Sequence, residues 1–65
     1  MAHPLQAAIV LEHWGEIDSQ CVMEVAKEIR GERTRRKCLA DGEERGLFST
    51  SVAREWESQF VEAGL

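Results

Sequence analysis

VMEVAKEIRGERTRRKCLADGEERGLF, residues 22–48, is the stretch that decides the arrangement of this 65-residue chain. Its first part places apolar side chains at positions i, i+3, i+4 and i+7, which is the spacing of one face of an α-helix. These residues are Val22, Val25, Ala26 and Ile29. Gly31 then predicts a tight turn, because glycine adopts the positive φ that ends a helix. Thr34 is expected to cap a second helix through its side-chain oxygen.

The same stretch closes on the sequence EERGLF, residues 43–48. This ending resembles the L-x-x-L-E-x-x-G-L-(V/I) close of the recognition helix in winged helix-turn-helix regulators. The resemblance covers residues 5–48, about two thirds of the chain. Besides a glycine at the turn, it is carried by Ala26, Ile29, Leu39, Glu43, Gly46 and Leu47. It implies a helix-turn-helix domain in which the second motif helix meets double-stranded DNA.

Further helices are predicted on both sides of this stretch. Residues 5–14 are mostly apolar in more than one direction, so this helix is expected to be covered on more than one side before it ends at Gly15. Asp18 or Ser19 is expected to cap the helix that follows. After Ser49-Thr50-Ser51, an apolar stripe at intervals of four residues predicts a fourth helix that ends at Gly64.

No pair of alternating strands follows the second motif helix, so a β wing is expected to be minimal or absent. The sequence therefore predicts one mainly α-helical domain over residues 1–65, with a three-helix helix-turn-helix core and a C-terminal helix. The residues expected to be buried together are Ile9, Leu11, Val25, Ile29, Leu39 and Leu47. Trp14 and Phe48 are also expected in the core.

Association is predicted from two apolar surfaces. The helix over residues 5–14 is more apolar than one small monomer is expected to cover, and Trp56 and Phe60 are expected to form a second exposed strip. A homodimer that joins these surfaces is expected. It would also suit a DNA-binding protein, because dimers read two half-sites.

Charge is distributed unevenly along the chain. The net charge is -4, but the segment 27–37 holds six of the eight basic residues and carries +4, which leaves -8 for the remainder. A local cationic patch of this kind is expected where phosphate is bound. The alternative is a solvated helix face whose cations pair with nearby acids.

The residues expected to contact DNA are Arg30, Arg33, Thr34, Arg35, Arg36 and Lys37. Cations in the first turn oppose the helix dipole by about 0.3–1 kcal/mol, which suggests that they are presented to an anion. Arginine is expected to read guanine, and arginine or lysine to bind phosphate.

Catalysis, metal binding and cofactors are not expected. His3 and His13 lack a nucleophile in a recognisable arrangement. His13, Cys21 and Cys38 match no standard zinc spacing, and both cysteines are expected to be buried thiols. No apolar run approaches the roughly 20 residues of a membrane span, and no signal-peptide layout is present, so a cytoplasmic location is expected.

Two functions follow from these observations. The first is a small sequence-specific DNA-binding transcriptional regulator. The alternative is a small helical protein-interaction module or inhibitor, of the kind that phages and plasmids encode, with an acidic working surface. The two differ in salt dependence, because DNA binding releases counterions.

Overall fold

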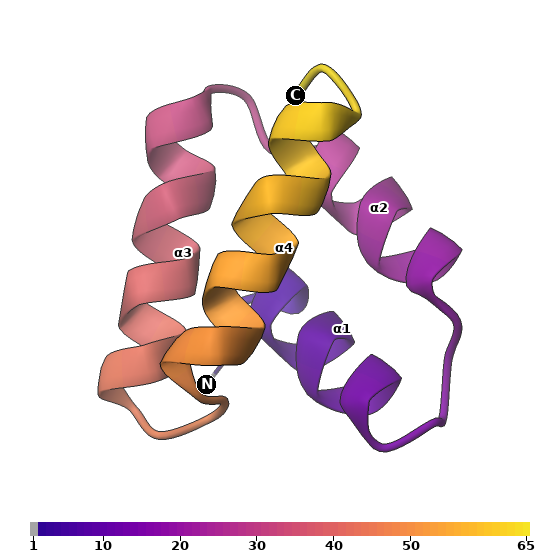
Figure 1. Cartoon of the computed structure of the whole chain (residues 1–65), viewed down its shortest axis with the longest axis vertical. Helices are drawn as coiled ribbons and strands as arrows, with labels where there is room; N and C mark the ends of the chain where they lie inside the picture. The colour runs from indigo at the N-terminus through magenta and orange to yellow at the C-terminus, as the bar shows by residue number, and fades with distance from the viewer. Residues whose placement is uncertain (1) are drawn as a thin grey trace.

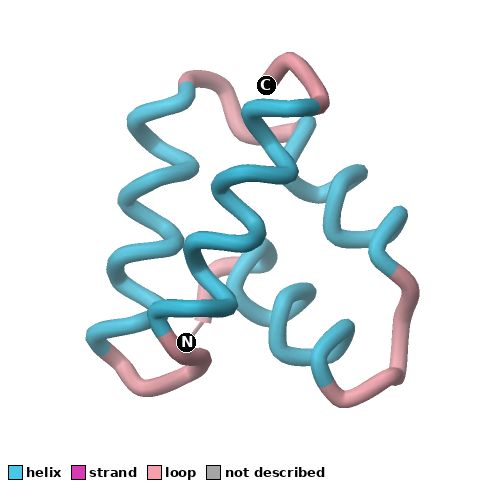
Figure 2. Tube along the Cα trace, viewed as in Figure 1, coloured by secondary structure: helices cyan, strands magenta, loops and turns pink. Residues whose placement is uncertain are grey.

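The computed structural model describes residues 2–65, which form four α-helices and no strand (Figure 1). The helices are α1 (Pro4–His13), α2 (Ser19–Lys27), α3 (Glu32–Glu44) and α4 (Thr50–Glu62). Figure 2 shows that only short loops separate them. The expectation of a mainly α-helical fold is confirmed.

The four helices form two helical hairpins packed against each other. α1 packs against α2, α3 packs against α4, and further contacts between α1 and α3 join the two hairpins. In Figure 1, α3 and α4 stand side by side, and α1 and α2 form the other half of the molecule. The C-terminal end of α4 lies at the same end of the molecule as the turn between α2 and α3.

The turns inside the two hairpins end their first helix in the same way. Gly15 after α1 and Gly46 after α3 have φ values of 81° and 74°. Each glycine N–H donates to a carbonyl of the last helical turn, that of Glu12 or Glu43, at 3.0 Å. This is the Schellman ending, which places glycine in the left-handed region that residues with a Cβ avoid.

The second helix of each hairpin, α2 or α4, also begins in the same way as the other. Asp18 caps α2 and Ser49 caps α4, each accepting from the backbone N–H three residues further on, at 3.1 and 3.2 Å. The residue before each cap, Ile17 or Phe48, is half-buried and packs against the core. A cap preceded by an apolar residue fixes the direction in which the chain enters the helix.

α3 begins differently from the other three helices. Its N-cap is Gly31, which has a φ of 91° and makes no side-chain cap hydrogen bond. The expectation that Thr34 caps this helix is therefore wrong: Thr34 is exposed inside the first turn.

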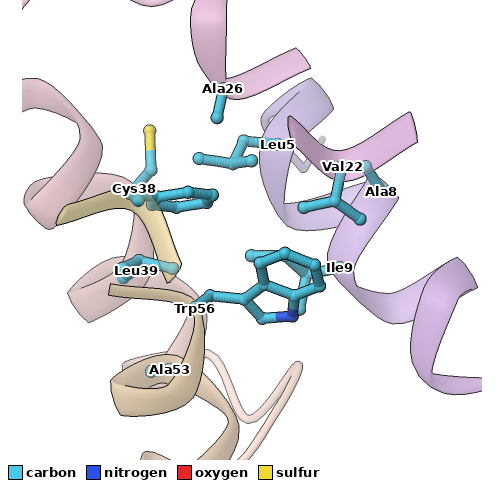
Figure 3. Packing of buried hydrophobic residues seen from close by; sticks show 10 residues of the cluster. Leu5, Ala8, Ile9, Val22, Ala26, Cys38, Leu39, Ala53 and Trp56 are labelled. Carbon is cyan, nitrogen blue, oxygen red and sulfur yellow. The ribbon is translucent and has the colours of Figure 1, made fainter. Parts of the chain in front are cut away.

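The core lies between the two hairpins and draws on all four helices. Its buried apolar members are Leu5, Ala8, Ile9, Val22, Ala26, Cys38, Leu39, Ala53, Trp56 and Phe60. Figure 3 shows the indole of Trp56 and the side chain of Ile9 pointing toward each other at its centre. α4 thus completes the core, because a three-helix arrangement without it would leave Ile9 and Leu39 uncovered on one side.

The expected core residues are only partly confirmed. Ile9 and Leu39 are buried, and Val25 and Ile29 are half-buried against the core. The expectation is wrong for two leucines and one tryptophan, whose exposed fractions are 37% for Leu11, 36% for Leu47 and 69% for Trp14. Leu11 lies on the outward face of α1, and Trp14 is the C-cap of this helix. Leu47 lies in the turn after α3. Phe48 is half-buried against the core.

A buried glutamine ties the two hairpins together. The amide nitrogen of Gln6 donates to the Cys38 carbonyl and to a carboxylate oxygen of Asp41, both at 2.9 Å. Its amide oxygen accepts from the backbone N–H of His3 at 3.0 Å, as part of the capping box that starts α1. Gln6 therefore uses both ends of its amide, which allows it to be buried without an unsatisfied polar atom.

Candidate nucleic-acid interface

The cationic segment, residues 27–37, spans the end of α2, the connection over residues 28–31 and the first half of α3. The connection is four residues long and brings the basic residues to one end of the molecule, next to the end of α4 (Figure 1). The structure divides the six basic side chains of this segment into three groups, according to what each one contacts.

Arg35 is a structural residue. It is 6% exposed, and its guanidinium donates to the carbonyl of Ile29 at 3.0 Å and to the carbonyl of Leu65. One side chain thus joins the α2–α3 connection to the residues after α4. The expectation that Arg35 contacts DNA is wrong, because its donors are used inside the protein.

Arg36 and Lys27 are exposed but paired with acids. The guanidinium of Arg36 lies 2.6 Å from a carboxylate oxygen of Glu32 and 3.3 Å from one of Glu57 on α4. The amine of Lys27 lies 3.6 Å from the carboxylate of Glu24 on α2. Exposed pairs of this kind contribute about 0–1 kcal/mol to stability. They nevertheless neutralise two of the six cations.

Arg30, Arg33 and Lys37 form the third group, which we name the cationic surface. All three are exposed, and none is within ion-pair distance of an acid in residues 2–65. Arg33 and Lys37 lie one helical turn apart on α3, on the side opposite the buried Leu39. Arg30 lies just before the turn at Gly31. The structure thus leaves four of the six predicted contact residues available to a partner: these three and the exposed Thr34.

Trp56 and Phe60 do not form the exposed strip that the sequence predicted. Both are buried, at 7% and 3% exposure, and their ring centroids lie 5.7 Å apart at an interplanar angle of 31°. The expectation that they line an interface is wrong, because α4 turns its apolar stripe toward the core. Among residues 2–65, the exposed large apolar side chains are instead Leu11, Trp14, Leu47 and, on α4, Val61.

The two cysteines occupy different environments. Cys38 is buried, as expected, and burial together with the nearby charge of Asp41 raises the pKa of its thiol above the ordinary value of 9.0. Cys21 is exposed at the start of α2, so the expectation that it is buried is wrong. Within residues 2–65, no three histidine, cysteine or acidic side chains come together in a way that could hold a metal ion.

Searches of protein-family models, curated proteins and solved structures gave no match for this chain. None of the helices in the described part of the chain is both long and apolar enough to cross a membrane. The side chains of the cationic surface are two guanidinium groups and one amine. These groups bind phosphate and carboxylate oxygens.

Proposed function

We propose that this chain is a small DNA-binding regulator whose cationic surface contacts the phosphates of duplex DNA. The observation that carries the proposal is the unpaired state of Arg30, Arg33 and Lys37 within residues 2–65, in a chain whose net charge is -4. In a protein of net negative charge, three unpaired cations at one end form a local positive surface that can bind an anionic partner.

The order of elements around this surface supports a helix-turn-helix mode of binding. A helix-turn-helix joins two helices through three or four residues, often including glycine, and the connection from α2 to α3 has four residues that end on Gly31. In such motifs the N-terminal residues of the second helix meet the base edges. Arg33 would then contact a base or phosphate, and Lys37 a phosphate.

The acids on α3 restrict how DNA can approach. Asp41, Glu43 and Glu44 occupy the C-terminal third of this helix, and DNA lying along the whole helix would be repelled by them. We therefore propose that α3 meets DNA with its N-terminal end. Contacts would then come from the α2–α3 connection and the first two turns of α3.

The proposal is tested by fluorescence anisotropy with labelled, mixed-sequence duplex DNA at low salt. Replacing Arg33 by Ala should weaken binding and lower its dependence on salt, because it removes one of the three cations proposed to contact the phosphates. Arg54→Ala is the matched control, because Arg54 is an exposed cation on α4 outside the cationic segment. An equal effect of the two substitutions, or an absence of DNA binding by the parent, would contradict the proposal.

The second candidate is a protein-interaction module or inhibitor. It is favoured by Trp14, which is 69% exposed, because tryptophan is enriched among the residues that contribute most to protein–protein binding. In this case the cationic surface would pair with an acidic protein. Arg33→Ala would then leave DNA retention unchanged, and this outcome separates the two candidates.

A further inference from the structure

A small cavity lies between the two hairpins, away from the cationic surface. The end of α1, the start of α2 and one side of α4 surround it, and its volume is about 90 Å³. Because one water molecule needs about 10–15 Å³ of cavity volume, the space holds several waters or a compound of a few non-hydrogen atoms. No residue of the cationic surface lines it, so this cavity and DNA binding can be tested separately.

Trp56 carries an unused hydrogen-bond donor beside this cavity. Its side chain lines the cavity and is only 7% exposed. The indole N–H donates to no acceptor in residues 2–65, where no side-chain nitrogen or oxygen is both fully enclosed and unpaired. The N–H therefore reaches an opening, and Figure 3 shows the nitrogen on the ring edge that faces away from Leu5 and Ala26. A buried tryptophan usually has a partner for this N–H, so a group inside the cavity is expected to accept from it.

Two carboxylates without a cationic partner line the same cavity. Glu12 comes from α1 and Glu55 from α4, and neither is within ion-pair distance of a basic side chain in the described residues. Glu12 is half-buried and accepts a hydrogen bond from the Ser19 hydroxyl at 3.2 Å. A carboxylate can accept about four hydrogen bonds, so most of the capacity of Glu12 is left for a ligand.

We infer that this cavity binds a small organic ammonium compound that also carries an oxygen acceptor, such as an amino alcohol. The ammonium group donates to the carboxylates of Glu12 and Glu55, and the oxygen accepts from the indole N–H of Trp56. The side chain of Val52 also lines the cavity and supplies an apolar contact for the carbon atoms between the two polar groups.

Other classes of ligand match the lining less well. A bare metal ion needs several ligands at once, and no three histidine, cysteine or acidic side chains in residues 2–65 are grouped to hold one. An ammonium group needs no such set, because its protons point to separate oxygens. An anion would be repelled by both carboxylates and by the net charge of -4. The exposed His13 and Gln59 complete the polar lining and can accept as well as donate.

Proton–nitrogen correlation NMR tests the inference at the indole N–H itself, with ethanolamine hydrochloride as the probe at constant pH and ionic strength. A ligand of about four non-hydrogen atoms binds no more tightly than tens of micromolar, so the titration runs from about 0.1 to about 50 mM. The chain has two tryptophans, and Trp14→Phe identifies which indole signal belongs to which. The Trp56 signal should shift and saturate, and the signal of the exposed Trp14 should stay in place.

Two control compounds and one control variant separate the contributions of charge and acceptor. Ethylene glycol keeps the oxygen without the charge, and ethylamine keeps the charge without the oxygen, so each should bind more weakly than ethanolamine. Glu12→Gln should raise the dissociation constant of ethanolamine about five- to tenfold, because charge-assisted hydrogen bonds are roughly twice as strong as neutral ones. Glu62→Gln should leave it unchanged, since Glu62 is an exposed acid of α4 that does not line the cavity.

The same spectra establish whether each variant keeps its fold, and Glu55→Gln decides the question if Glu12→Gln does not. A Trp56 signal that stays in place at the highest ethanolamine concentration overturns the inference and assigns the cavity to water alone. Equal shifts with ethylene glycol and ethanolamine also overturn it, as does equal weakening by Glu62→Gln and Glu12→Gln. In both cases binding would not depend on the carboxylates inside the cavity.

Discussion

Arg33 and Arg35 are two residues apart on α3 and have opposite environments. A separation of two residues rotates the side chain by about 200°, so one arginine faces solvent and the other the core. The guanidinium of Arg35 donates hydrogen bonds to the carbonyls of Ile29 and Leu65, whereas the side chain of Arg33 is exposed. The same residue type thus stabilises the fold at one position and remains available to a partner at the other.

Replacing each of these arginines by Ala separates the two roles. Arg35→Ala should lower the free energy of unfolding by about 3–6 kcal/mol, because it removes two hydrogen bonds from a charged group, and each contributes about 1.5–3 kcal/mol. Arg33→Ala should change it by less than about 0.5 kcal/mol, as is usual for a surface substitution. Urea unfolding measures both. Equal stability of the two variants would contradict the placement of Arg35.

The two cysteines should differ in reactivity for a related reason. The pKa of the Cys38 thiol is raised, first by burial and then by the charge of Asp41, so at a given pH a smaller fraction of this thiol is ionised than of an ordinary thiol. At pH 8 a colorimetric thiol reagent should modify Cys21 quickly and Cys38 slowly in the folded protein. After unfolding, both should react alike. Similar rates in the folded state would show that Cys38 is not buried.

The same raised pKa gives a direction to the pH dependence of stability. As the pH rises through the ordinary thiol value, the unfolded chain loses the Cys38 proton before the folded chain does. The unfolded state then binds fewer protons, and the stability of the fold decreases. Cys38→Ser should remove this part of the decrease, which a series of urea titrations above about pH 9 can measure.

At the scale of the element, α3 contains a glycine where helix propensity disfavours one. A glycine inside a helix costs about 1 kcal/mol relative to alanine, and Gly42 lies in the third turn of α3. The structure explains it by the ring of Phe48: a Cβ on Gly42 would lie 2.2 Å from the Phe48 Cζ. Gly42 therefore lets the turn after α3 fold back onto the helix.

Gly42→Ala should consequently destabilise the protein despite the better helix propensity of alanine. Displacing the ring of Phe48 should cost about 1–3 kcal/mol, the usual range for overpacking. Phe48→Leu in the same chain should recover part of this loss, because leucine leaves room for the methyl group. Thermal unfolding of the two variants checks both statements. An increase in melting temperature for Gly42→Ala alone would contradict the close packing.

The local features of these elements could be predicted from the sequence. Gly15 and Gly64 were expected to follow helices, and Asp18 was expected as a possible cap, because such signals depend on a few neighbouring residues. The face toward which α4 turns Trp56 could not be predicted. It depends on how the two hairpins pack, and an apolar stripe looks the same whether a neighbouring helix or a second molecule covers it.

The cationic segment could be predicted from the sequence, but not which of its side chains are left exposed and without an acidic partner. The cationic segment is visible in the sequence as a charge imbalance, and three of its basic residues remain exposed and unpaired among residues 2–65. The pairing of Arg36 with Glu57 brings together residues 21 positions apart. Such a contact follows from tertiary packing, which the local pattern of residues does not contain.

At the scale of the whole molecule, the fold separates surfaces of different character. The cationic surface lies at the α2–α3 end, the exposed Leu11 and Trp14 at the end of α1 are apolar, and acids occupy much of the remaining surface. The molecule is small, with principal extents of 25 × 23 × 22 Å, so these surfaces lie near one another. Under the proposed function, DNA would meet the cationic surface with the acids turned away, and this would limit its approach to one end of the molecule.

The dependence of DNA affinity on salt concentration tests this account most directly. Each phosphate neutralised contributes about -0.9 to the slope of log K against log salt, so the three cations Arg30, Arg33 and Lys37 predict a slope of about -2.7. Lys37→Ala should reduce the magnitude of this slope by about one, and Arg54→Ala should leave it unchanged. An absence of DNA binding at low salt, or a slope that Lys37→Ala does not alter, would contradict the central claim.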